Sequence, residues 1–263
     1  MWTLLPESGL PFVSVLEKSS VRILPDGAMD VIATFHPDGH IDKTFAVGAM
    51  TCPQLTTVGN QAVAGIRFLP GAGGSALGVN AVTLTDGQID VRDVARQHGA
   101  VRDVFRLLHR NASDARALHR FADVIGMNRR FVPPLVRRAA GLIASSSTST
   151  RIEQIAKDLG VSRQHLAREF AAHAGLTPKR YAQICRVRAM LARVQRRVAN
   201  CRRESSHAAA AQVSWSALAA DYGYADQSHL ISEVSAIIGQ TPGEWQATAG
   251  SNIPIVPVSV APL

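Results

Sequence analysis

Hydrophobic and polar residues follow two different patterns along the chain. Over residues 1–90, short apolar runs such as 31–35 and 64–69 are separated by turn sequences. These turns are Pro25-Asp26-Gly27, Pro37-Asp38-Gly39, Pro70-Gly71 and Asp86-Gly87. Many short strands between turns rich in Pro, Asp and Gly predict a β-rich domain, shaped as a small barrel or sandwich.

From about residue 91 the apolar spacing becomes helical. Apolar residues recur at intervals of three and four over 101–108 and again over 118–125, and residues 135–143 predict a further helix. Six hydroxyl residues, Ser145 to Thr150, predict a linker. The predicted fold class is α+β with two domains. The divisions are 1–145, a β-rich domain with a helical extension; 146–247, an all-α domain; and 248–263, an extended tail.

The C-terminal half contains a degraded internal repeat, because residues 155–181 recur at 218–245. The matching pairs, 63 or 64 positions apart, are Gly160 with Gly223, Leu166 with Leu230, Glu169 with Glu233, Thr177-Pro178 with Thr241-Pro242, and Tyr181 with Trp245. Each copy has the length of a helix-turn-helix, so the repeat predicts two such units that grip consecutive turns of DNA.

The expected helices of this half have recognisable starts and turns. Ser162 is a predicted N-cap, and Thr177 is expected to cap a long helix that runs to about Arg197. Gly160 and Gly223 supply the positive φ that the turn of a helix-turn-helix requires. Residues 198–213 fit either helix or loop. With that segment counted, the half is expected to hold seven helices.

The second helix of each copy carries polar side chains on its outer face. Arg can bind guanine with two hydrogen bonds and Gln can do the same with adenine, so such a face suits the major groove. The predicted DNA-binding residues are Ser162, Arg163, Gln164 and Arg168 in the first copy and Gln227, Ser228, His229 and Ser232 in the second. The second copy has no Arg there, which predicts weaker readout. Arg180, Arg186 and Arg193, on the long helix between the copies, are the predicted phosphate contacts. A solvated helix face is the alternative.

Charge is unevenly divided. Residues 1–128 hold 11 Lys+Arg against 12 Asp+Glu, whereas residues 129–263 hold 17 against 8. The second half is therefore expected to bind a polyanion, although a basic surface without such a partner is an alternative.

Three cysteines without a C-x-x-C motif predict free thiols and a cytoplasmic protein. The sequence shows no signal peptide and no apolar stretch of about 20 residues, so we expect no membrane association.

The repeat resembles the AraC/XylS family of bacterial transcription regulators over about 100 residues. The similar segments are Ile155-Ala156, Gly160-Val161-Ser162, Leu166, Arg168, Phe170, Gly175-Leu176-Thr177-Pro178 and Tyr181, then Leu218-Ala219, Tyr222-Gly223-Tyr224, Asp226 to Leu230 and Gly239 to Pro242. The resemblance implies a seven-helix domain that contacts two adjacent major-groove segments. It places Gln164 and Arg168 at base-reading positions, with Gln227, Ser228 and Ser232 at the corresponding places of the second unit.

The chain departs from the family pattern at three places. Ser232 stands where Arg is frequent, Val234 where Phe is usual, and residues 198–213 are longer than the common connection.

The N-terminal part also resembles a sensor-type domain of one subgroup of this family. The similar pieces are Leu24 to Gly27, Asp30, Val47-Gly48 and Gly65 to Gly71.

Other chemistry has little support in the sequence. His36 and His40 flank a turn, but two ligands are too few to predict a metal site. Arg67, inside an apolar strand, needs a partner such as Asp26 or Asp30, or an anion; Arg67 and Asp30 are thus the only effector-binding candidates.

We find no nucleophile motif, expect no cofactor, and predict a regulator rather than an enzyme. A DNA-tethered β-barrel enzyme and a protein–protein interaction module stay as alternatives. The candidate partners are promoter or operator DNA, RNA polymerase, a second copy of the chain, and a small-molecule effector.

Overall fold

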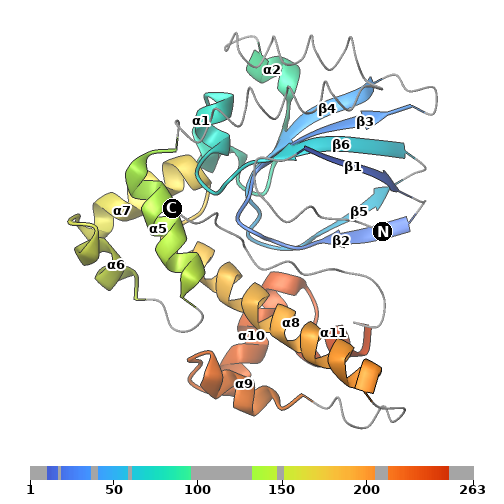
Figure 1. Ribbon diagram of the computed structural model, residues 1–263. Coiled ribbons are helices and arrows are strands. Elements are labelled where there is room, and N and C mark those ends of the chain that lie inside the picture. The colour runs from blue at the N-terminus through green and yellow to red at the C-terminus, as the bar shows by residue number, and fades with distance from the viewer. Residues whose placement is uncertain are drawn as a thin grey trace.

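The computed structural model describes residues 11–16, 19–36, 41–58, 61–95, 132–146, 151–204 and 213–248. The helical patterns at 101–108 and 118–125, most of the Ser145–Thr150 linker and the tail beyond Thr248 lie outside these residues. Within them the chain has a β-rich N-terminal part and an all-α C-terminal part (Figure 1), so the predicted α+β fold class is confirmed.

The N-terminal part contains two antiparallel sheets. One has the strand order β1-β6-β3-β4-β7 and the other pairs β2 with β5. The strands are β1 (Pro11–Leu16), β2 (Ser19–Ile23), β3 (Asp30–Phe35), β4 (Ile41–Val47), β5 (Gln54–Val58), β6 (Gln61–Arg67) and β7 (Gln88–Asp90). Along β3, buried residues alternate with half-buried ones, as expected for a strand whose two faces meet different environments. Short helical segments follow the strands: α1 (Gly73–Leu77), η1 (Ala81–Leu84) and α2 (Val91–Ala95).

The C-terminal helices are α5 (Pro134–Ser145), α6 (Ile152–Asp158), α7 (Arg163–Ala174), α8 (Pro178–Glu204), α9 (Trp215–Asp221), α10 (Gln227–Ile238) and α11 (Pro242–Thr248). Helix α8 extends beyond the predicted end at Arg197, so residues 198–204 are helical. The described residues from 151 onward form six helices, α6 to α11, and α5 brings the number to the predicted seven. That helix packs against α6, α7 and α8, and its buried face is Val136, Ala139, Ala140 and Ile143.

The two parts are packed against each other, and a single hydrophobic core runs through both. Gly27 in the N-terminal part lies against Tyr181 of α8, and Gly71 lies against Val136 of α5. A Cβ at Gly27 would be 2.6 Å from Cδ2 of Tyr181, and the residue also has φ +78°, so a glycine is needed there. The sheets therefore sit directly on the helices that carry the repeat (Figure 1).

No helix among the described residues combines the length and the apolar character needed to cross a bilayer.

Candidate DNA-binding site

The two copies of the repeat fold into two helix pairs with the same dimensions. We call α6 with α7 the first unit and α9 with α10 the second unit. In both units a 7-residue helix precedes a 12-residue helix. The turn glycines are left-handed in both, with φ +70° at Gly160 and +69° at Gly223, which confirms the prediction made for them. A residue with a Cβ rarely adopts this conformation, so the turn depends on glycine.

The ends of the second helix in each unit are also equivalent. Ser162 Oγ accepts a hydrogen bond from the backbone N–H of His165 at 3.1 Å, as predicted, and Asp226 Oδ1 accepts one from His229 at 2.7 Å. At the other end, Gly175 and Gly239 cap the helices with φ +74° and +72°. The predicted cap at Thr177 is confirmed as well, since its hydroxyl accepts from the N–H of Arg180. In both α7 and α10, residues adjacent in the sequence therefore cap the N-terminal and the C-terminal end of the helix.

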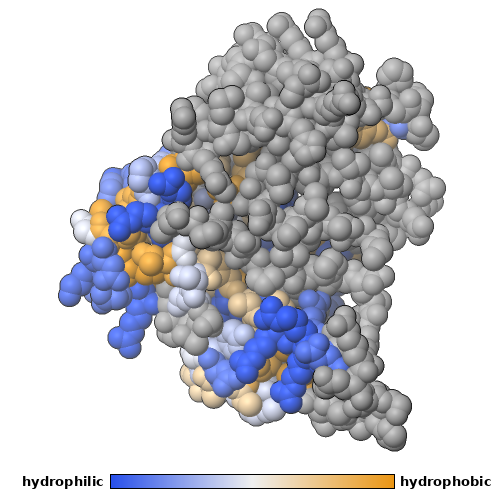
Figure 2. Space-filling model, in the orientation of Figure 1, coloured by the Kyte–Doolittle hydropathy of each residue, from blue (hydrophilic) through white to orange (hydrophobic). Residues whose placement is uncertain are grey.

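All eight predicted DNA-binding residues are exposed. They lie at the N-caps and in the first two turns of α7 and α10, and they are Ser162, Arg163, Gln164, Arg168, Gln227, Ser228, His229 and Ser232. Leu166 and Phe170 in α7, and Leu230 and Val234 in α10, point into the core. Figure 2 shows hydrophilic residues over the first unit and over the lower helices, on the face that it presents. The two outer faces are therefore available to a large partner.

The first outer face carries an internal contact. Arg168 Nη2 lies 3.0 Å from Nδ1 of His165, and its side chain is 72% exposed. Its ion pair with Glu169 is long, at 3.4 Å. Such an exposed pair contributes little to stability, so the guanidinium can turn toward another acceptor at small cost.

The three arginines of α8 have different surroundings. Arg193 is exposed and pairs with Asp221 at 3.0 Å. Arg180 is half-buried and donates to the carbonyl oxygen of Thr51 in the N-terminal part. Arg186 is only 15% exposed, and its Nη2 lies 2.5 Å from Oε1 of Glu233. Of the three, Arg193 alone keeps the exposure expected of a phosphate contact.

Glu233 is the centre of a buried polar cluster that the sequence did not reveal. Besides Arg186, it accepts hydrogen bonds from Gln183 at 3.0 Å and from the hydroxyl of Tyr224 at 2.9 Å. The Arg186 guanidinium also stacks 4.1 Å from the centre of the Tyr224 ring. Burial, and next the charge of Glu233, raise the pKa of Tyr224 well above its usual range. This cluster fastens the second unit to α8.

The remaining candidate, Arg67, forms a salt bridge with both acidic neighbours. It lies 2.7 Å from Asp26 and 2.9 Å from Asp30, so the predicted structural pairing is confirmed. Burial opposes its charge, but the two carboxylates outweigh that effect and raise the pKa of Arg67. In this structure Arg67 therefore joins Asp26 of the turn to Asp30 of β3.

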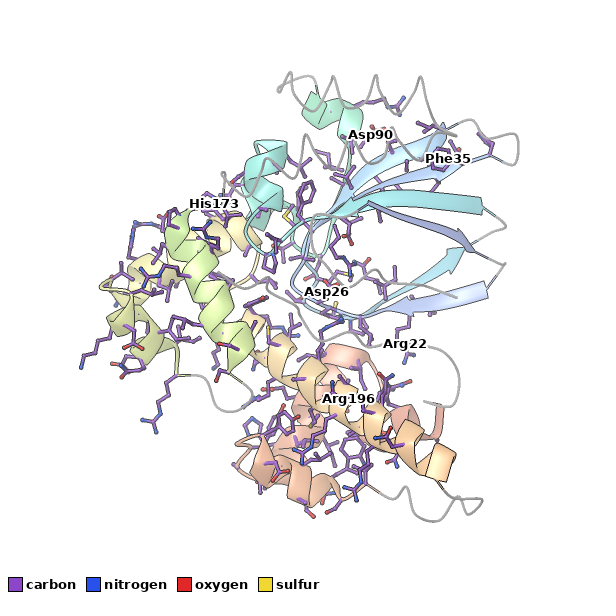
Figure 3. All side chains as sticks on the ribbon, in the orientation of Figure 1. Arg22, Asp26, Phe35, Asp90, His173 and Arg196 are labelled. Atoms are coloured by element: carbon purple, nitrogen blue, oxygen red, sulfur yellow. The ribbon has the colours of Figure 1, made fainter. Side chains whose placement is uncertain are left out.

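Next to this salt bridge, α8 contributes buried polar groups to the interface between the two parts. Arg188 donates to the carbonyl oxygen of Pro25 at 3.3 Å, beside Asp26 (Figure 3). The hydroxyl of Tyr181 is buried, and burial, followed by the nearby Cys185 thiol, raises its pKa well above the usual range. Burial raises the pKa of that thiol to about 12. A neutral thiol at neutral pH suits a structural position rather than a reactive one.

Within the described ranges, no group of three or more His, Cys, Asp and Glu side chains is placed to hold a metal ion. His36 forms an ion-pair contact with Asp42 at 3.5 Å, and His40 lies outside the described residues.

Comparison with known families agrees with this geometry. A family profile described as a helix-turn-helix domain matches residues 155–248, which span both units. This domain is of the AraC type. The match supports DNA-binding transcription regulation as the role of this part of the chain. A second profile, described as a domain of unknown function (DUF6597), matches residues 2–90.

Comparison with solved structures gives distant likenesses to ToxT from Vibrio cholerae. One, of ToxT from strain O395, has 12% identity and a TM-score of 0.42, covering 91% of this chain and 97% of that chain. Another, an unsaturated fatty acid bound ToxT from strain SCE256, has 10% identity and a TM-score of 0.41, covering 90% and 94%. No curated protein sequence matches this chain significantly.

Proposed function

We propose that this AraC-type regulator reads a bipartite DNA site, with the N-terminal half of α7 in one major groove and that of α10 in the next. The observation that carries the proposal is the equivalence of the two units. Both have the same helix lengths, the same turn and cap geometry, and four exposed polar residues at the same end of the second helix. A helix-turn-helix places this end of its recognition helix against the base edges.

The packing of the N-terminal part is compatible with this role. Its contacts with α7 involve His173 and Gly175, and its contacts beyond α10 involve Gly239 and Gln240. These residues lie at the C-terminal ends of the two helices, whereas the proposed readout residues lie at the N-terminal ends. The contacts of the described N-terminal residues therefore lie away from the proposed readout residues.

We assign the readout residues by chemistry. Arg168 and Arg163 suit guanine, and Gln164 and Gln227 suit adenine. Ser162, Ser228, His229 and Ser232 complete the two faces. Arg193 is proposed as a phosphate contact, whereas Arg186 and Arg180 hold the protein together. The N-terminal part is proposed to sense an effector or to mediate dimerisation, and RNA polymerase is the proposed further partner of a bound regulator.

Selection of duplexes from a random pool by the full-length protein tests the proposal. We expect enrichment of two short conserved blocks whose centres are about one helical turn apart. Affinity for the selected site should fall steeply with salt, because phosphate contacts release counterions. Arg92→Ala is a matched control, since Arg92 is an exposed arginine of the N-terminal part paired only locally with Asp90. Recovery of a random pool by the wild-type protein would refute sequence-specific binding.

A further inference from the structure

Both recognition helices end against the N-terminal part, and they meet it at the two ends of one loop. This loop, residues 48–53, joins β4 to β5, and we call it the β4–β5 loop. A Cβ at Gly175, which ends α7, would lie 3.1 Å from the carbonyl oxygen of Ala81 and 3.3 Å from Oγ1 of Thr85, with Cβ of Ala49 next at 3.5 Å. A Cβ at Gly239, which ends α10, would lie 2.8 Å from Cγ of Pro53. Two equivalent glycines of the repeat therefore lie near positions of this loop that are four residues apart.

Polar contacts reinforce both ends. On the first unit, Thr85 Oγ1 donates to the carbonyl oxygen of Gly175 at 2.6 Å, and Ser75 Oγ lies 3.2 Å from His173 Nδ1. On the second unit, Arg22 Nη1 donates to Oε1 of Gln240 at 2.5 Å. Figure 3 shows Arg22 on the side of the sheets that faces the lower helices, and His173 beside α1. The N-terminal part thus holds each unit by at least one hydrogen bond.

The middle of the loop is attached to the helix that joins the units. The carbonyl oxygen of Thr51 accepts a hydrogen bond from Arg180, near the start of α8. The loop itself is fastened by Asp86, which accepts from the N–H of Thr51 at 2.6 Å and from its hydroxyl at 2.5 Å. Asp86 has φ +57°, which is rare for a residue with a Cβ. Asp86, in the turn before β7, thus holds Thr51 of the β4–β5 loop by two hydrogen bonds.

These contacts close a ring. Along one path, α8 joins the units through the Phe170–Tyr181 ring contact and the Glu233 cluster. Along the other path, the β4–β5 loop joins the C-terminal ends of α7 and α10. Helix α5 also holds the first unit against α8, and the β4–β5 loop adds a second connection between the two units.

We infer that the β4–β5 loop sets the separation and relative angle of the two recognition helices, and thereby the spacing between DNA half-sites that the protein accepts. The inference rests on the proposed function, because spacing has a meaning only if both units read DNA. It assigns Arg22, Pro53 and Gln240 as positioning residues for DNA specificity, although none of them lies on a recognition face.

The first test measures, in the absence of DNA, how widely the distance between the two units varies. The full-length protein carries Cys52→Ser and Cys201→Ser, and spin labels are attached at Lys157→Cys and Ala220→Cys. These two positions are exposed and lie one in each unit, so the labels report the distance between the units. We expect one narrow distance distribution. Arg22→Ala with Pro53→Ala should broaden it, and Gln240→Ala, which removes the same hydrogen bond from the opposite side, should broaden it to a smaller extent. Arg92→Ala should leave it narrow. An equally narrow distribution in the double variant would overturn the inference.

The second test measures the spacing preference on the selected operator, with one base pair inserted or removed between the half-sites. The wild-type protein should lose about tenfold in affinity, since half-site spacing is a geometric requirement. The double variant should lose no more than about threefold, because freed units can adjust. An identical spacing profile in both proteins would overturn the role of the loop. Absence of any sequence preference in the wild-type protein would instead refute the proposed function, and the spin-label distances would still report the restraint.

Discussion

The two helix-turn-helix units share one backbone design but are held in place by different chemistry. The first unit packs on α8 through the Phe170 and Tyr181 rings, whose centres are 5.4 Å apart. The second unit has Val234 in place of that Phe and is fastened through the buried Glu233 cluster. The equivalent of Glu233 is Glu169, which makes only a long contact with Arg168. A repeat thus keeps the features that define its local fold while its anchoring contacts diverge.

The largest expected difference between the units concerns these glutamates. Glu233→Ala leaves the Arg186 guanidinium buried without its carboxylate, which should lower the free energy of unfolding by about 3–5 kcal/mol. Glu169→Ala removes a partly exposed pair and should cost less than about 1 kcal/mol. Chemical denaturation of the two variants measures both values. Equal losses would mean that the buried cluster does not anchor the second unit.

A second contrast concerns the residues that fill the core at the matching position. Phe170→Ala should destabilise the protein by about 3–5 kcal/mol. Val234→Ala removes about two methylene equivalents at roughly 0.8 kcal/mol each, so its expected cost is about 2 kcal/mol. Thermal unfolding monitored by circular dichroism compares them, with Ala236→Ser on the exposed face of α10 as a control. A larger loss from Val234→Ala would contradict the packing described above.

The outer faces should differ in how strongly they read DNA. Arg168→Ala should weaken binding to the selected site by about 1–3 kcal/mol and relax one base position in the first half-site. Ser232→Ala, at the equivalent position of the second unit, should cost less than about 1 kcal/mol, because a lone hydroxyl discriminates bases poorly. Binding titrations on specific and random duplexes separate readout from charge. If Arg168→Ala weakens both duplexes equally, Arg168 contacts phosphate and not a base.

The smallest effect should be the same in both units. Ser162→Ala and Asp226→Ala each remove the side chain that caps a recognition helix, and each should lower stability by about 1 kcal/mol. Urea denaturation gives the two values, and Ser162→Asp should retain stability because aspartate is an equally good cap. A cap loss confined to one unit would show that the two helices do not share the same local design.

Local features of this protein could be predicted from its sequence, because they depend on residues close together in the chain. The turn glycines Gly160 and Gly223, the caps at Ser162 and Thr177, and the pairing of Arg67 follow from short patterns or from a single buried charge. The end of α8 was harder to place, since the charged stretch after Arg197 has little apolar periodicity.

Contacts between distant segments could not be predicted in the same way. The Glu233 cluster joins α8, α10 and Tyr224, and nothing in the spacing of these residues marks them as neighbours. The docking of the β4–β5 loop is a further example, because Pro53 and Gly239 each have an ordinary local role as a turn residue and a helix cap. The helix predicted at 135–143 belongs to α5, whose packing on α7 and α8 has no signal in the local pattern.

The different chemistry of the two outer faces has a consequence for gene control. One face offers two arginines and the other none, so on the proposed readout a bound duplex would have distinguishable ends and a reversed site would not be equivalent to the original. A single chain acting in this way has a built-in polarity: it would point toward one neighbouring gene and away from the other.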